Sequence, residues 1–194
     1  MERDYDYQSE RHFSDRGDPA AIGVSAAHKA LKRLNPRKAK TQAAPVIYDP
    51  VVSMSLINHF ASAINGAGIA RGTSFLKDKM GAQIFAPGVR VTDDPHRLRG
   101  HRSKPFDGEG VANRRTALID DGVLQTWLLD MATALQLKLT STGHAARGTS
   151  GPPSPSITNL YMEAGALSPK DLIADIKSGF YVTELIGMGV NGVT

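Results

Sequence analysis

The feature that most constrains the fold is a turn dipeptide between two predicted strand segments. Asp121-Gly122 follows residues 114–120 and precedes residues 123–129, which include Trp127. Asp-Gly is favoured where a tight hairpin needs two residues of positive φ, so the sequence predicts an antiparallel strand pair. The 19 glycines and 11 prolines among 194 residues add many further turns. Together these features favour a β-rich body over a helical bundle.

Two helices are predicted before this hairpin. Asp18-Pro19 has the form of an N-cap followed by proline, and apolar residues recur at helical spacing until Asn35-Pro36. Pro50 opens a second helix, which Asn65-Gly66 is expected to end. The basic stretch 37–44 lacks large apolar residues and is interpreted as a linker.

The remaining elements are shorter. Residues 1–16 alternate aromatic and charged side chains, which favours an edge strand or a segment that docks on another surface. Further strands are expected at 45–48, 83–85, 89–93, 157–162 and 180–186, further helices at 131–137 and 168–176, and a long loop at 140–156. Because residues 187–194 follow a strand without a closing turn, the sequence is interpreted as a fragment of a longer protein.

Composition excludes several classes of function. The chain has no cysteine, which removes disulfides, thiolate ligands and thiol nucleophiles. It has no apolar stretch long enough to span a membrane and no signal peptide, so a cytoplasmic protein without membrane contact is expected. The net charge is +4, with basic runs at 29–40 and 97–104 that are interpreted as solvated surface, so nucleic acid is not the expected partner.

The chain offers little chemistry of its own. Only His96 and His101 lie close together among the six histidines, and the segment between them is basic and lacks a carboxylate. No nucleophile elbow or P-loop occurs. The acidic pairs Asp93-Asp94 and Asp120-Asp121 are interpreted as turns. The sequence therefore predicts no catalytic residue, no metal ligand and no cofactor in this chain.

Two loops are candidates for contacts with a substrate or partner. Phe106-Asp107-Gly108-Glu109-Gly110 places two carboxylates among glycines, and Ser141-Thr142-Gly143-His144-Ala145 places a histidine in a glycine and hydroxyl loop. The alternative is structural: Asp107 and Glu109 accept backbone N–H bonds in a turn, and His144 is a capped surface residue. The candidate contact residues are Phe106, Asp107, Glu109, Gly110, His144 and Asn159.

These segments, in this order, resemble the TldD/PmbA family of metallopeptidase-related proteins, historically labelled modulators of DNA gyrase. The resemblance covers residues 106–111, 118–124, 127–129, 141–145, 159–161 and 172–179. Residues 70–76 and 183–190 resemble the PmbA branch, also called TldE. Essentially the whole chain takes part.

The resemblance implies that this chain is not the zinc-bearing subunit. TldD-type members carry a His-Glu-x-x-x-His helix, and the PmbA or TldE type lacks it. If His59 stands at the first histidine of that motif, Phe60 replaces the glutamate and Ile64 the second histidine. Zinc is then expected in a TldD-like partner, and these three positions form a degenerate metal helix.

The resemblance also implies the architecture and the role. The expected class is α+β: residues 1–40 end an N-terminal domain with a strand, a helix and a linker. Residues 41–194 form most of a C-terminal domain with an antiparallel curved β-sheet, barrel-like, and a few flanking helices. The chain would be a non-catalytic subunit that pairs with a TldD-like peptidase, as a heterodimer or higher oligomer, and acts in proteolysis and maturation of unfolded peptides. An active metallopeptidase with a metal site around His96, His101 or His144, and a DNA- or gyrase-associated module, stay open as alternatives.

Overall fold

The computed structural model describes residues 2–186, and the chain divides into two compact units, Met1–Ala43 and Ala44–Thr194. In the first unit, the short 3₁₀ helix η1 (Phe13–Asp15) precedes helix α1 (Pro19–Lys32). The Asp18 side chain accepts the Ala20 N–H, which confirms the predicted N-cap.

The edge strand expected within residues 1–16 is wrong for the described part of that segment. Two aspartates bind it to α1 instead: Asp4 contacts Arg33 Nε at 2.7 Å, and Asp6 contacts Lys29 Nζ at 3.1 Å. Side-chain ion pairs therefore hold this segment where backbone pairing was expected.

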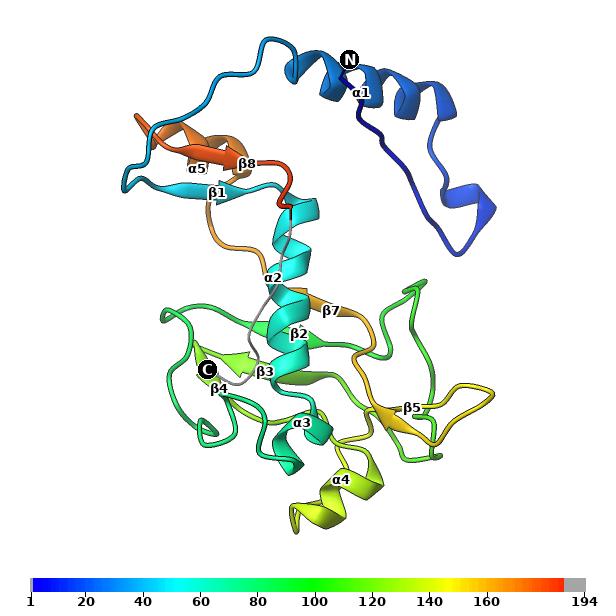
Figure 1. Ribbon diagram of the computed structural model, residues 1–194. Coiled ribbons are helices and arrows are strands. Elements are labelled where there is room, and N and C mark those ends of the chain that lie inside the picture. Colours follow the sequence, from blue (N-terminus) through cyan, green and yellow to red (C-terminus); the bar gives the residue numbers. More distant parts are fainter. Residues whose placement is uncertain (1, 187–194) are drawn as a thin grey trace. The chain divides into compact units, whose positions relative to one another are not determined.

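The second unit alternates short strands with helices (Figure 1). In chain order it contains β1 (Val46–Tyr48), α2 (Pro50–Ala63), α3 (Gly66–Ala70), β2 (Val91–Asp93), β3 (Thr116–Asp120), β4 (Val123–Leu124), α4 (Met131–Gln136), β5 (Ala145–Ala146), β6 (Ser154–Pro155), β7 (Leu160–Met162), α5 (Pro169–Ala174) and β8 (Phe180–Val182). Within residues 2–186, no helix is both long and apolar enough to cross a bilayer.

The central element is an antiparallel sheet of four strands in the order β4-β3-β2-β7. Asp121 and Gly122 form the β3–β4 turn with φ values of 48° and 77°, as the predicted hairpin requires. The strand expected at 83–85 is reduced to a single bridge between Gln83 and Val123. The helices and antiparallel strands confirm the α+β class. Among the described residues the sheet is open and does not close into a barrel.

Helix α2 covers one face of this sheet (Figure 1). Phe60 and Ile64, which are 7% and 0% exposed, pack with residues of the sheet and of the loops beside it. The buried cluster contains Phe60, Ala63, Ile64, Leu76, Val91, Leu118, Ile119, Leu124 and Leu128. The helix begins at Pro50, as predicted, and the structure adds Asp49 as its N-cap.

Three features differ from the sequence-based expectations. Asn65 ends α2 but also caps a new short helix, α3, by accepting the Ala67 N–H. The expected loop 140–156 contains the small ribbon β5–β6. Strand β8 pairs in parallel with β1, where an antiparallel sheet was expected. The predicted features at 187–194 lie outside the described residues.

Candidate functional site

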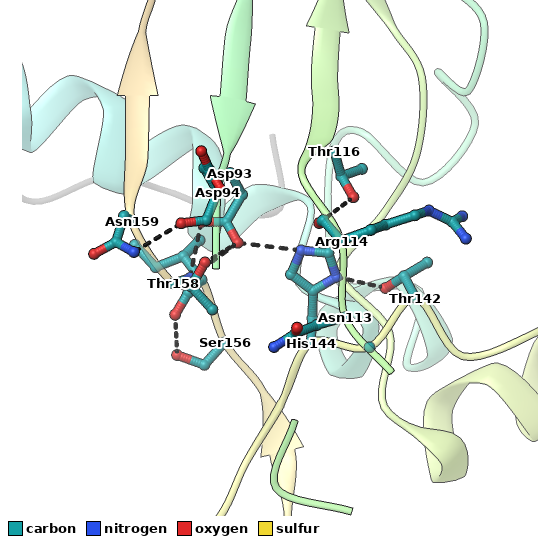
Figure 2. A network of polar contacts seen from close by, with 12 residues as sticks. Asp93, Asp94, Asn113, Arg114, Thr116, Thr142, His144, Ser156, Thr158 and Asn159 are labelled. Carbon is teal, nitrogen blue, oxygen red and sulfur yellow. Dashed lines mark hydrogen bonds and ion pairs between the residues drawn. The ribbon is translucent and has the colours of Figure 1, made fainter. Parts of the chain in front are cut away.

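The second unit contains a buried pair of ionisable side chains, Asp93 and His144 (Figure 2). Asp93 is the last residue of β2, and His144 directly precedes β5. Asp93 Oδ2 lies 3.3 Å from His144 Nε2, and the residues are 0% and 2% exposed. Buried groups of this kind are stable only when paired and hydrogen-bonded, and both conditions are met here.

Two threonines complete the network. Thr158 donates its backbone N–H and its hydroxyl to the Asp93 carboxylate, at 2.8 and 2.6 Å to the nearest oxygens. Thr142 Oγ1 lies 2.9 Å from His144 Nδ1 and accepts the Leu129 N–H at 2.8 Å. The network thus joins β2 to the segments on both sides of the β5–β6 ribbon.

The arrangement combines a hydroxyl, an imidazole and a carboxylate, the three groups of a nucleophilic triad. Thr142 Oγ1, however, already accepts a backbone N–H and lies within 3.2 Å of the Leu129 carbonyl. His144 is enclosed between Asp93 and Thr142. The geometry therefore supports a structural clasp between strand and loop.

Two interpretations from sequence are wrong at this clasp. Asp93 belongs to a strand and is fully buried, whereas the Asp93-Asp94 pair was expected to form a turn. His144 is buried, whereas the structural alternative placed it on the surface. Asp93 and Thr158 were missed because their partners lie far away in sequence. Thr142 lies in the candidate loop itself, two residues before His144, but was not singled out. Asp94, the second residue of that pair, does behave as expected of a turn, since its side chain accepts the His96 N–H.

Asp107 organises a second clasp beside the first. Its Oδ1 accepts the N–H groups of Glu109 and Val111, each at 2.9 Å, and its Oδ2 accepts the Ala145 N–H at 3.0 Å. The side chain is 3% exposed. The Ala145 carbonyl in turn accepts from Gly108 N and from the Lys104 ammonium. Asp107 thus ties its own turn to the start of β5.

The other residues of the first candidate loop have separate positions. Glu109 Oε2 accepts the Met131 N–H at 2.8 Å, next to the Asp130 cap, and so stabilises the N-terminus of α4. Phe106 is 56% exposed. Gly110 has a φ of 80° at the exposed end of the turn.

Asn159 holds the basic segment that precedes residue 105. Its Oδ1 accepts the Arg102 N–H at 3.0 Å, and its Nδ2 donates to Asp94 O at 2.7 Å and to Ser103 Oγ at 2.9 Å. Of the six candidate contact residues, the structure therefore gathers Asp107 and His144 around Ala145 and places Asn159 at another loop.

Helix α2 does not offer a zinc site. Phe60 and Ile64 point into the hydrocarbon core, and the Nε2 atom of His59 is enclosed without a hydrogen-bond partner. An orphaned imidazole nitrogen can bind a metal, but zinc needs about three protein donors and a hydrolytic site also needs a water-activating base. Across residues 2–186 no group of three or more His, Cys, Asp or Glu side chains is arranged to hold a metal ion. The residues present therefore do not fit zinc.

The histidines of the alternative metal site are also occupied elsewhere. His96 Nε2 lies 2.8 Å from Asn113 Oδ1, and His144 belongs to the buried clasp. His96, His101 and His144 do not form a group with metal-ligand geometry within the described chain.

Comparison with known proteins gives a consistent family assignment. Residues 41–194 match the family profile described as PmbA/TldA metallopeptidase C-terminal domain. The chain is 39% identical over its 194 residues to the "Metalloprotease PmbA" of Escherichia coli O157:H7 and covers 41% of that protein. The chain thus spans about two fifths of the length of the curated relatives it matches.

Two solved structures share the fold. A crystal structure from Bacteroides thetaiotaomicron, described as a proposed modulator of DNA gyrase, aligns with a TM-score of 0.83 and 28% identity. That alignment covers 95% of this chain and 39% of the other. TldE from Thermococcus kodakarensis aligns with a TM-score of 0.76 and 26% identity, covering 87% and 38% of the two chains. On its sequence and its fold, this chain belongs to the metallopeptidase-related PmbA/TldD family.

Proposed function

We propose that this chain is part of a PmbA- or TldE-type subunit that carries no catalytic metal and works together with a TldD-like zinc peptidase. The observation that carries the proposal is the composition of α2. Where the zinc-bearing helix needs a glutamate and a second histidine, this helix has Phe60 and Ile64, 7% and 0% exposed. A hydrocarbon core at those positions gives a dication no ligands and gives water no proton acceptor.

The names of two relatives support the proposal, one the link to a metallopeptidase and the other the assignment to the TldE type. The Escherichia coli relative is named a metalloprotease, and the Thermococcus kodakarensis structure is TldE. Peptidase activity would then belong to an assembly in which another subunit supplies zinc. Unfolded peptides, processed in the cytoplasm, are the substrates that we propose for that assembly.

The outer edge of β7 offers a binding mode for an extended peptide. Asp94 N donates to Asn159 O, and Glu163 N donates to Arg90 O, so alternate residues of this segment face β2. Leu160 and Met162 therefore turn their backbone groups away from β2. In the described part of the chain no strand pairs with that edge. An added strand would bind through main-chain hydrogen bonds, which require little sequence specificity.

The proposal is tested with the intact protein that carries this chain and a TldD-like protein from the same source. We expect cleavage of an unfolded peptide only when both are present, and zinc bound only to the TldD-like protein. Substituting the first histidine of the partner's His-Glu-x-x-x-His helix abolishes both zinc binding and cleavage.

The matched variant in this chain is His59→Ala. It removes the single imidazole of α2, and we expect unchanged metal content and unchanged cleavage by the assembly. Stoichiometric zinc in the isolated protein, lost in His59→Ala, would overturn the proposal and favour an independent metallopeptidase. Salt-sensitive binding of duplex DNA without any peptide cleavage would favour the DNA-associated alternative.

A further inference from the structure

The loop of residues 94–104, called here the basic loop, has an unusual surface. It carries Arg97, Arg99, Arg102 and Lys104 and contains no acidic residue after Asp94. Leu98 lies between two of the arginines and is 89% exposed. We infer that the basic loop is a docking element for an acidic protein surface with an apolar recess that receives Leu98. Taking the TldD-like subunit as the owner of that surface rests on the proposed function.

The basic loop is held in one conformation by the protein beneath it. The Asn159 side chain contacts the backbone at Asp94 and Arg102 and the hydroxyl of Ser103. A Cβ atom at Gly100 would lie 2.6 Å from Ser103 Oγ and 2.7 Å from Asn159 Oδ1, so the loop backbone lies directly against this side chain. Asn159 therefore supports the loop from inside.

The two ends of the basic loop are also joined. Lys104 N donates to Pro95 O at 3.0 Å, and Ser103 Oγ donates to Arg97 O at 2.5 Å. Lys104 turns its ammonium inward to the Ala145 carbonyl. A surface loop fixed in this way loses little conformational entropy on binding, which is the advantage of a preorganised contact.

Arg97 is positioned as well as exposed. Its guanidinium lies 5.4 Å from the centre of the Tyr161 ring, which supports the cation without neutralising it. The neighbouring Arg115, by contrast, is paired with Glu163 at 2.9 Å. Arg97 therefore keeps its charge for an external anion, and carboxylates are the natural partners of a guanidinium in a protein interface.

The presence of Leu98 favours a protein over a nucleic acid. A leucine held between arginines gains free energy by entering an apolar recess, whereas a phosphate backbone offers it none. Tyr161, the aromatic ring beside the loop, is engaged with Arg97 and is not presented for base stacking. Arginine flanking a desolvated apolar contact is also typical of the centre of protein interfaces.

The test measures affinity between the intact protein and the purified TldD-like subunit. We expect Leu98→Asp to weaken binding at least about 10-fold, equivalent to about 1.4 kcal/mol. The double variant Arg97→Glu/Arg99→Glu should weaken binding and flatten its dependence on salt. Matched controls are Leu135→Asp, at a leucine 80% exposed on α4, and Lys77→Glu/Lys79→Glu, at two other exposed cations. These should change the dissociation constant less than about 2-fold.

The accessibility of the loop is measured separately, by thiol labelling of Leu98→Cys. We expect fast labelling in the free protein and protection in the complex. Slow labelling in the free protein would show that its own chain covers the loop and would overturn the inference.

The remaining outcomes separate this inference from the proposed function. A complex that forms but tolerates both the Leu98 and the arginine variants refutes the docking role and leaves the proposed function standing. Absence of any complex with the wild-type protein refutes both. Binding of duplex DNA that depends on Arg97 and Arg99 but not on Leu98 replaces the protein partner with a nucleic acid.

Discussion

The Asp107 clasp gives the sharpest prediction about stability. In Asp107→Asn, one oxygen can still accept from Glu109 and Val111, but the amide NH₂ replaces the oxygen that accepts the Ala145 N–H. Because Ala145 is 0% exposed, water cannot replace the lost acceptor. Losing a charged acceptor for a buried donor costs about 2–3 kcal/mol. Asp107→Ala removes both oxygens and with them all three hydrogen bonds, and should cost about 4–5 kcal/mol, with water serving the two donors of the turn.

The assay is hydrogen exchange followed by mass spectrometry, on peptides that contain Ala145. For Asp107→Asn the protection of this segment should fall about 30- to 150-fold, as about 2–3 kcal/mol implies. The control is Asp120→Asn, an exposed partner of Arg90 at 2.9 Å, where less than about 0.5 kcal/mol is expected. Wild-type protection in Asp107→Asn would refute the reasoning, because the Ala145 N–H would then not depend on the carboxylate.

Three further predictions concern packing and pH. A Cβ at Gly66 would lie 2.6 Å from the Leu128 carbonyl, so Gly66→Ala should lower the free energy of unfolding by about 1–3 kcal/mol. On the same helix, a Cβ at Gly68 would meet nothing closer than 3.9 Å, so Gly68→Ala should raise the free energy of unfolding by about 0.5–1 kcal/mol. Thermal unfolding of the two variants distinguishes these outcomes. The pKa of Asp4 is lowered by the backbone N–H of Tyr5 and by Arg33, and the pKa of Asp6 is lowered by Ser25 and Lys29. The two carboxylates therefore stabilise the folded first unit fully above their ordinary pKa of 3.8, and this contribution is lost as pH falls below it. Protease cleavage of residues 2–16 should then accelerate, and an unchanged rate at low pH would contradict this. Desolvation by burial, and then the hydrogen bond to Asp49, raise the pKa of Tyr181. This tyrosine therefore stabilises the fold up to pH about 10, and the contribution is lost as pH rises further. Tyr181→Phe should remove this dependence of stability on pH, and tyrosinate absorbance reports the titration.

Local signals in the sequence predicted the elements that depend on neighbouring residues. Asp18 and Asp49, each followed by proline, mark the starts of α1 and α2, because an N-cap bond involves residues two positions apart. Asp121-Gly122 marks the hairpin for the same reason. The family resemblance implied an antiparallel sheet and the α+β class, and the hairpin signal agreed with both; the four-strand order β4-β3-β2-β7 was not predicted.

Features that depend on distant residues could not be predicted in this way. Asp93 and His144 are separated by about fifty residues, and an aspartate at a strand end gives no indication of which side chain will bury it. Asn159 was predicted as a contact residue, but its amide contacts with a loop some sixty positions earlier in the chain were not foreseen. Such pairings are decided by three-dimensional packing and leave no periodic pattern in the sequence.

The parallel pairing of β1 with β8 has a consequence for how the chain is made. Val46 faces Phe180, so the two partners leave the ribosome 134 residues apart. The hairpin β3–β4 closes over a two-residue turn and can form as soon as it is synthesised, while β1 waits for almost the whole unit. During that interval the unpaired backbone of β1 is open to wrong partners. The order of synthesis therefore makes β1 the strand most in need of protection during folding.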